Sequence, residues 1–285
     1  MSSVIELTPP VVFLSDLHLN ASHRDQYLFN FLDFLSHKYA IGSLVLVGDV
    51  FDFHLGYKHT LYRHLFPFYQ RLYQWKSQNK QIHLFTGNHD PDPDPFLIED
   101  LAIQVHTAPQ LFRIKKDIIR VEHGDQQDPQ FIKRTICKWV RHPFTRSVAR
   151  LLPPSYYQTM CKTLLHSSTS PSASPSNDIT RSDVDIPFPT GFIAQCWHRM
   201  HQHNPSINAW IMGHYHRVAC LVDSQSTGNT SELGLPKVPQ KIIFLGDWVH
   251  LHTFLYWTNE DIFLYHYKQG KLHSLSVGDH TSDIL

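Results

Sequence analysis

The chain has 285 residues, which is long enough to bury a large core in one or two domains. Its 25 lysines and arginines balance 25 aspartates and glutamates, so the net charge favours neither a nucleic-acid-binding protein nor a strongly acidic one. No stretch approaches the roughly 18 apolar residues of a membrane-spanning helix, and the first residues show no signal-peptide pattern. The four cysteines form no C-x-x-C pair, which disfavours a zinc knuckle or a thioredoxin site and fits a reducing compartment.

The first third of the chain alternates apolar runs of strand length with helical patterns. The runs at 11–14, 44–47 and 82–85 predict buried strands. Apolar residues recur at helical spacing over 28–35 and over 61–75, which predicts a helix in each interval. This alternation favours a largely parallel sheet that is buried on both faces.

Apolar runs without long helical intervals fill the end of the chain. Because short connections suit antiparallel neighbours, the closing runs are expected to pair antiparallel. The whole pattern indicates an α/β (α+β) fold with two sheets packed face to face and helices outside, and we find no internal repeat. The later strands are predicted at 118–122, 208–212, 218–222, 241–245, 253–257 and 262–267.

One long segment differs in charge from the rest of the chain, because residues 129–177 contain no aspartate or glutamate. Its lysines and arginines fall largely off the apolar face of a predicted helix, which is a basic amphipathic pattern. The serine- and proline-rich stretch at 167–177 is typical of a mobile linker. We therefore predict a single domain over 1–285 with a basic helical insertion over 129–190.

Five polar blocks each follow a predicted strand, and together they contain carboxylates, imidazoles and one amide. Ligand sites gather at the carboxyl ends of parallel strands, so these side chains are expected to converge. Such a mixed oxygen and nitrogen set suits two divalent metal ions. The blocks are Asp16-Leu17-His18, Gly48-Asp49-Val50-Phe51-Asp52, Gly87-Asn88-His89-Asp90, His123-Gly124-Asp125 and Gly213-His214-Tyr215-His216.

The spacing within the blocks supports a metal site. Asp16 and His18 lie two residues apart, so their side chains project the same way from an extended backbone. His214 and His216 repeat this spacing. A single D-x-H or H-x-H pair is more often a packing feature than a metal site. Five such blocks in order, each after a strand, favour the dinuclear site.

The order D-x-H, G-D-x-x-D, G-N-H-D, H-G-D and G-H-x-H resembles the calcineurin-like metallophosphoesterase superfamily over residues 11–257. The resemblance implies a four-layer αββα sandwich, which agrees with the strand pattern. It also implies two divalent metal ions with Asp49 as the bridging ligand. By the same resemblance, one ion is bound by Asp16, His18 and His216, and the other by Asn88, His123 and His214.

Other residues of the blocks are expected to act beside the ligands. His89 is expected to face the substrate and to stabilise the phosphoryl oxygens or protonate the leaving group, while Asp52 orients His89. Asp90 and Asp125 are expected to fix imidazole tautomers or loops. For Asp52 and Asp125, a structural role in a turn is an equal alternative. The ligand set accepts Mn, Fe, Zn or Co, and the family resemblance favours manganese.

Within the superfamily, the chain is most similar to the UDP-2,3-diacylglucosamine diphosphatases of lipid A biosynthesis. The likeness rests on the opening strand at 11–19, the G-D-x-F-[ED] form of the second block, the helical insertion and the strand-end motif at 244–248. It implies hydrolysis of UDP-2,3-diacylglucosamine to UMP and 2,3-diacylglucosamine 1-phosphate (lipid X). His89 is a departure, because well-known members have arginine there and the G-N-H-D form belongs to the wider superfamily.

For a lipid-linked nucleotide-sugar substrate, the insertion offers apolar residues for acyl chains and a basic face. Arg141, Arg146, Arg150 and Trp139 are expected to contact the substrate or an anionic membrane, where each basic residue contributes about 1 kcal/mol. The alternative is a helical hairpin with a solvated basic face. The expected location is the cytoplasm, with peripheral attachment to the inner membrane. Neither a nucleic acid nor a protein partner is expected.

Two other functions stay open on the sequence. A phosphodiesterase or phosphatase of the same fold would act on another nucleotide, a nucleic acid or a phosphoprotein. A nuclease is expected to carry basic residues along a groove with stacking aromatics, whereas here the basic residues gather in one insertion. A binding module that has lost its metals would show broken ligand positions, but every expected ligand and His89 are present.

Overall fold

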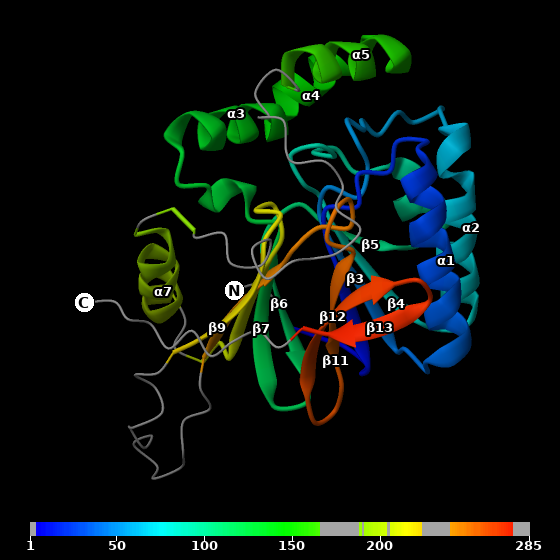
Figure 1. Cartoon of the computed structure of the whole chain (residues 1–285). Helices are drawn as coiled ribbons and strands as arrows, with labels where there is room; N and C mark the ends of the chain where they lie inside the picture. Colours follow the sequence, from blue (N-terminus) through cyan, green and yellow to red (C-terminus); the bar gives the residue numbers. More distant parts are fainter. Residues whose placement is uncertain (1–3, 166–187, 190, 204–205, 224–239, 276–285) are drawn as a thin grey trace.

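The computed structural model describes residues 4–165, 188–189, 191–203, 206–223 and 240–275. Within them, a sheet of six strands and a sheet of seven strands lie face to face, and helices cover their outer faces (Figure 1). The serine-rich linker predicted at 167–177 lies outside the described residues.

The first sheet has seven strands in the order β13-β12-β11-β2-β3-β4-β5. Neighbours from β2 to β5 are parallel, whereas β11, β12 and β13 pair antiparallel, as the sequence predicts for the closing runs. The strands are β2 (Val11–Leu14), β3 (Ser43–Val47), β4 (Gln81–Phe85), β5 (Gln104–His106), β11 (Thr253–Trp257), β12 (Ile262–Lys268) and β13 (Lys271–Ser274).

The second sheet has six strands in the order β1-β6-β7-β8-β10-β9. β7, β8 and β10 run parallel to one another, while β6 pairs antiparallel with β7 and β9 with β10. The strands are β1 (Ile5–Glu6), β6 (Gln110–Ile114), β7 (Asp117–Glu122), β8 (Ala209–Met212), β9 (Val218–Val222) and β10 (Lys241–Leu245).

The sheets and helices form four layers. α1 (His23–Lys38) and α2 (Phe66–Ser77) cover the outer face of the first sheet, and α7 (Phe192–His203) covers that of the second (Figure 1). In β2, Val11 and Phe13 pack between the sheets while Val12 and Leu14 pack against the helices. The strand is wholly apolar because both of its faces are buried. The predicted αββα sandwich is confirmed.

Three further helices lie across the top of the molecule in Figure 1, outside the four layers. They are α3 (Phe131–Arg141), α4 (Pro143–Ala149) and α5 (Pro154–Leu165). α4 begins at Pro143, whose fixed φ suits the first helical position. No helix of the described residues is long and apolar enough to cross a bilayer. The shorter helical turns are η1 (Arg63–Leu65), η2 (Phe96–Asp100) and η3 (Asp125–Gln127).

The predicted strands are confirmed with ends that differ by at most one residue. The helix expected over 61–75 begins only at Phe66, and Leu61 is exposed in the preceding loop. Pro67 in the first turn favours a start at this point. The sequence did not predict β1, β5, β6 or β13. Three of these strands are sheet edges, and polar residues at Gln110 and Arg113 interrupt the apolar run of β6, so their apolar signal is weak.

Candidate metal centre

The five polar blocks meet at one rim of the sandwich. They follow β2, β3 and β4 in the first sheet and β7 and β8 in the second, and each of these strand groups is internally parallel. The loops are joined by backbone hydrogen bonds, from Asp16 N to Gly48 O at 3.1 Å and from Gly213 N to His123 O at 2.9 Å. Convergence follows from the parallel order, because the carboxyl ends of such strands lie at the same edge.

One set of side chains gathers at the end of β2. Asp16, His18 and His216 each present one ligand atom, and these atoms all lie within 4.8 Å of one another. Oδ1 of Asp16 is 3.4 Å from Nε2 of His216 and 4.0 Å from Nε2 of His18. Oδ1 of Asp16 and Nε2 of His18 are both buried and lack hydrogen-bond partners. A divalent cation would satisfy both atoms, so this set fits a metal ion.

A second set gathers between the two sheets. Asp49, His123 and His214 present ligand atoms within 4.8 Å of one another. The amide oxygen of Asn88 completes the set, at 3.2 Å from Nε2 of His123 and 3.0 Å from Nδ1 of His214. This combination of imidazole, carboxylate and amide donors fits a divalent transition metal.

Asp49 stands between the two sets. Its Oδ2 is 3.3 Å from Nε2 of His123 and 4.0 Å from Nε2 of His18, so one carboxylate borders both groups of imidazoles. Its Oδ1 accepts the backbone N–H of His89 at 2.8 Å, which fixes the carboxylate plane. A shared carboxylate also reduces the repulsion between two nearby cations.

The backbone is left-handed at five of the predicted ligands. Non-glycine residues rarely adopt positive φ, each costs on the order of 1–3 kcal/mol, and such residues cluster at functional sites. The surrounding buried loops maintain these conformations. The φ angles are 54° at Asp16, 48° at His18, 49° at Asp49, 67° at His214 and 50° at His216.

Two glycines allow the loops to approach one another. A Cβ at Gly87 would collide with the carboxylate of Asp49, and a Cβ at Gly213 would collide with the side chain of Ser15. Ser15 in turn donates to Oδ2 of Asp16 at 2.5 Å. Any larger residue at either glycine would therefore displace a predicted ligand.

Three of the imidazoles are fixed through the nitrogen that does not face the ligand set. Such hydrogen bonds select the tautomer and orient the ring of a metal-binding histidine. Sequence analysis did not identify Asp128 or Asp247, although Asp247 belongs to the noted motif at 244–248. The bonds are His123 Nδ1 with Val47 O (2.9 Å), His214 Nε2 with Asp128 Oδ2 (3.1 Å) and His216 Nδ1 with Asp247 Oδ2 (3.0 Å).

His89 lies beside the ligand sets and is held on two sides. Its Nδ1 is 3.0 Å from Oδ1 of Asp52, and the ring of Phe53 stacks on it with centroids 4.4 Å apart. Burial lowers the pKa of His89, but the carboxylates of Asp49 and Asp52 outweigh this effect and raise it. The structure brings the predicted pair together, and it adds Phe53, which sequence analysis missed.

Asp90 and Asp125 contact loops and helices. The Asp90 carboxylate accepts the backbone N–H groups of Gly87 at 2.5 Å and Val50 at 2.8 Å, so it ties the second block to the third. Burial, with Asp49 nearby, raises the pKa of Asp90. Asp125 accepts Nε of Arg141 at 2.7 Å and Nη2 at 3.0 Å.

The rim concentrates opposite charges. Burial alone would lower the pKa values of His123 and His216, but Asp49 and Asp16 raise them to about 10 and about 9 respectively. Burial would raise the pKa of Asp49, yet His123 and His89 hold it well below its usual range. The carboxylates and imidazoles therefore favour each other's charged forms, and binding of divalent cations to these imidazoles would require their deprotonated forms.

The three predicted arginines of the insertion form ion pairs with carboxylates outside it. Arg141 binds Asp125, as described above, and its side chain is largely buried. Nη1 of Arg146 is 3.0 Å from Oδ1 of Asp92, and Nε of Arg150 is 2.7 Å from Oδ2 of the same residue. Asp92 is almost fully buried. These contacts hold α3 and α4 against the rim.

Several large apolar side chains of α3 and α4 are exposed to solvent, among polar ones such as Lys138. Trp139 is 70% exposed, Phe144 is 71% exposed and Leu151, just after α4, is 83% exposed. Ile136 and Val148 are also exposed. We call these five residues the apolar face. Several large exposed apolar side chains on neighbouring helices are typical of an interaction surface.

α5 packs against the loop that carries Phe53. Tyr157 and Cys161 of α5 form a buried cluster with Phe53 and Leu55. Tyr57 in the same loop donates its hydroxyl to the carbonyl oxygen of Leu152 at 2.8 Å. Since Phe53 stacks on His89, this cluster connects α5 to the rim.

No family model matches the chain, but it is similar to known proteins. The chain is 22% identical over 268 residues to UDP-2,3-diacylglucosamine hydrolase of Porphyromonas gingivalis, covering 89% of this chain and 96% of that protein. It is 24% identical over 253 residues to the protein of the same name from Pseudomonas paraeruginosa, covering 84% and 90%. Among solved structures, a dimetal phosphatase from Danio rerio aligns with a TM-score of 0.46 at 12% identity, over 95% of this chain and 100% of that one.

The sequence similarity spans nearly all of both relatives, so it extends well beyond the five blocks. The blocks themselves meet at one rim, where two sets of donors fit divalent cations. Over most of its length this chain is therefore similar to the UDP-2,3-diacylglucosamine hydrolases, and the order of its five blocks resembles that of the calcineurin-like metallophosphoesterases.

Proposed function

We propose that the protein hydrolyses the diphosphate of UDP-2,3-diacylglucosamine to UMP and 2,3-diacylglucosamine 1-phosphate (lipid X), a step of lipid A biosynthesis. The observation that carries this proposal is the similarity to two hydrolases of that name, which covers 96% and 90% of their chains. A likeness limited to a general catalytic core would leave the residues between the blocks unmatched.

Two divalent ions, proposed to be manganese, would be held at the rim; the same donors also accept iron, zinc or cobalt. When bound, such ions polarise phosphoryl oxygens, neutralise their charge and supply a nucleophile at neutral pH. The residues proposed to hold them are Asp16, His18 and His216 for one ion, Asn88, His123 and His214 for the other, and Asp49 between them.

His89 would act on the phosphoryl group through Nε2. Its Nδ1 is 3.0 Å from Oδ1 of Asp52, which keeps a proton on that nitrogen, and the carboxylates of Asp49 and Asp52 raise the pKa of His89. A protonated Nε2 can stabilise charge on a phosphoryl oxygen or give its proton to the departing phosphate. In this proposal His89 is the catalytic residue, and Asp52 and Phe53 are positioning residues.

The apolar face would receive the acyl chains of the substrate or enter the membrane interface. Because Arg141, Arg146 and Arg150 are paired with carboxylates, attraction to an anionic surface would rest more on exposed groups such as Lys138. Trp139 is suited to the interface, since its ring is amphipathic. We therefore propose peripheral attachment to the cytoplasmic side of the inner membrane.

The cluster of α5 with Phe53 and Leu55 supports a single binding region for both ends of the substrate. Acyl chains against the helices and a diphosphate at the rim would be separated by the loop that carries Phe53. Binding energy from the chains would then help to place the diphosphate against His89.

One residue favours a second candidate, a metallophosphoesterase with another phosphodiester or phosphomonoester substrate. His89 gives the third block the G-N-H-D form of the wider superfamily, and the well-known diphosphatases have arginine there. An imidazole stabilises one phosphoryl oxygen, whereas a guanidinium can bind two oxygens at once. The substrate therefore needs a direct test.

Mass analysis of products decides between the candidates. The purified chain, supplied with manganese, is incubated with UDP-2,3-diacylglucosamine and, separately, with bis(p-nitrophenyl) phosphate. UMP and lipid X as products would support the diphosphatase, provided that Asp49→Ala in parallel forms neither. Efficient cleavage of the nitrophenyl diester with an intact UDP-lipid would instead support the second candidate.

A further inference from the structure

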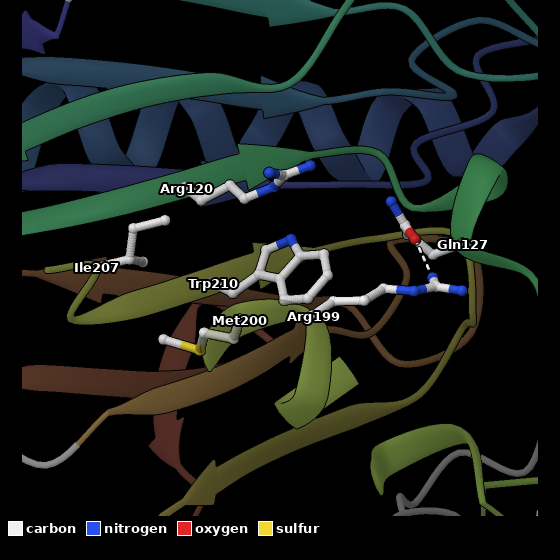
Figure 2. Close-up of a pocket in the computed structure, with 6 residues that line it drawn as sticks. All are labelled: Arg120, Gln127, Arg199, Met200, Ile207 and Trp210. Atoms are coloured by element: carbon white, nitrogen blue, oxygen red, sulfur yellow. Dashed lines mark hydrogen bonds between the residues drawn. The ribbon is translucent and has the colours of Figure 1, made fainter. Parts of the chain in front are cut away.

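A cavity of about 170 Å³ lies between α7 and the outer face of the second sheet (Figure 2). It is lined from β7, η3, α7, β8 and the loop that precedes β8, and none of its residues is a predicted metal ligand. The reaction proposed above makes no use of them. The lining residues are Arg120, Gln127, Arg199, Met200, Ile207 and Trp210.

The described lining contains two guanidinium groups and no carboxylate. The carboxylate of Glu122 lies behind these lining residues. It accepts hydrogen bonds from Nε of Arg120 at 2.8 Å, Nε1 of Trp210 at 2.8 Å and Nε2 of Gln127 at 3.1 Å. Arg199 donates to Oε1 of Gln127, which is a neutral amide (Figure 2). The carboxylate of Glu122 thus balances only one of the two guanidinium charges, so the cavity favours an anion.

The remaining wall is apolar. Met200, Ile207 and Trp210 are almost fully buried. The guanidinium of Arg120 lies over the Trp210 ring, 5.1 Å from its centre, which holds the guanidinium plane in place. The volume corresponds to roughly five or six water molecules at about 30 Å³ each. A concave site with two fixed cations and an apolar floor suits a small organic anion.

We propose that this cavity binds a small organic anion, whose carboxylate or phosphate oxygens accept hydrogen bonds from Arg199 and whose short apolar part lies against Met200 and Ile207. The anion would replace the amide oxygen of Gln127, because a charged acceptor forms the stronger bond with a guanidinium. This site is additional to the proposed hydrolysis and does not depend on it.

Gln127 connects the cavity to the metal centre. It ends η3, and the next residue, Asp128, has its Oδ2 3.1 Å from Nε2 of His214. At the other end of η3, Asp125 holds α3 through Arg141. An anion that releases Gln127 would therefore act on a turn fixed to a predicted metal ligand.

Isothermal titration calorimetry of the full chain tests the site. The probes are sodium butyrate, inorganic phosphate and the neutral butyramide, all at constant ionic strength. We expect saturable binding of an anion and none of butyramide. Tighter binding of butyrate would identify a carboxylate with an apolar tail as the ligand class, and tighter binding of phosphate would identify a phosphate group.

Two variants separate a binding role from a structural one. Arg199→Met should weaken anion binding about tenfold or more, because a hydrogen bond to a charged group is lost. Gln127→Ala should strengthen anion binding, because the amide oxygen that competes for Arg199 is removed. A general loss of stability would weaken binding in both variants, so opposite changes in affinity would indicate a binding role. Arg113→Met, on the exposed side of β6, is the matched control. Equal binding by wild type and Arg199→Met, or the absence of saturable binding by either anion, would overturn the proposal.

Discussion

The rim and the helices α3 and α4 both carry many charged residues, but the two regions use them differently. At the rim, buried carboxylates face imidazoles, and atoms such as Oδ1 of Asp16 have no hydrogen-bond partner. On the helices, the arginines are matched with Asp125 and Asp92. The rim therefore has buried ligand atoms without hydrogen-bond partners, which a cation can bind. On the helices, the arginines already form ion pairs, and apolar side chains are exposed.

The difference lies in whether buried polar groups already have partners. We call the ion pairs of Arg141, Arg146 and Arg150 with Asp125 and Asp92 the anchors of the helices. Unpaired buried ligand atoms and left-handed backbone are unfavourable for folding alone, and they persist where a ligand offsets them. A bidentate pair between arginine and carboxylate leaves little capacity for another ligand. The comparison predicts that changes at the rim alter turnover most and that changes at the anchors alter the position of the helices.

The largest expected effect is that of Asp49→Ala. Because Asp49 borders both donor sets, its loss should lower turnover about 10³-fold or more, equivalent to about 4 kcal/mol of transition-state stabilisation. Turnover with manganese and bound metal by elemental analysis are the measurements. Asp33→Ala, at a partly exposed ion pair with Arg71, is the control. Near-wild-type turnover with two bound ions in Asp49→Ala would contradict the metal assignment.

Asp52→Asn should have the next largest effect. It removes the carboxylate that orients His89, so the rate constant should fall about 10²-fold, within the range for general acid–base catalysis. Bound metal should stay at the wild-type amount, which separates positioning of His89 from loss of a ligand. The pKa of His89 should fall, moving the alkaline limb of the pH–rate profile to lower pH. An unchanged profile would leave Asp52 with only a structural role.

Replacing three residues of the apolar face tests the outer side of the helices. Trp139→Ser, Phe144→Ser and Leu151→Ser together should weaken binding to anionic vesicles about tenfold or more, because burial of each side chain contributes about 1.5–3 kcal/mol. Sedimentation with vesicles measures this partition. Tyr73→Ser, at a 62% exposed position on α2, is the control. Equal sedimentation of the triple variant and wild type would argue against attachment through this face.

The smallest effect is expected at the anchor. Asp92→Asn removes the buried carboxylate shared by Arg146 and Arg150, so α4 should exchange its amide hydrogens faster and stability should fall by about 1–3 kcal/mol. Asp33→Asn, which breaks the partly exposed pair with Arg71, should lower stability by less than Asp92→Asn does, because water screens that pair more strongly. Exchange mass spectrometry and urea unfolding are the measurements. Unchanged exchange in α4 would show that the two arginines do not hold the helix.

Much of the rim could be anticipated because its signals are local. Apolar runs identified β2, β3 and β4. The extended backbone expected at Asp16 and His18 is wrong, because β2 ends at Leu14 and both residues have left-handed φ angles. Parallel order then required the blocks to meet at one edge. The sequence by itself determined the fold class, the edge at which the five blocks meet and the residue types gathered there.

The partners of these side chains were decided by tertiary structure. Asp128, Asp247 and Phe53 fix the rings of His214, His216 and His89. Spacing along the chain indicates none of these pairings, although Asp247 lies in the noted motif at 244–248. Likewise, the basic pattern of the insertion did not show that its arginines turn toward Asp92 and Asp125. Strand order and block spacing follow from short-range periodicity, whereas a hydrogen bond or ion pair between distant elements depends on how their surfaces pack.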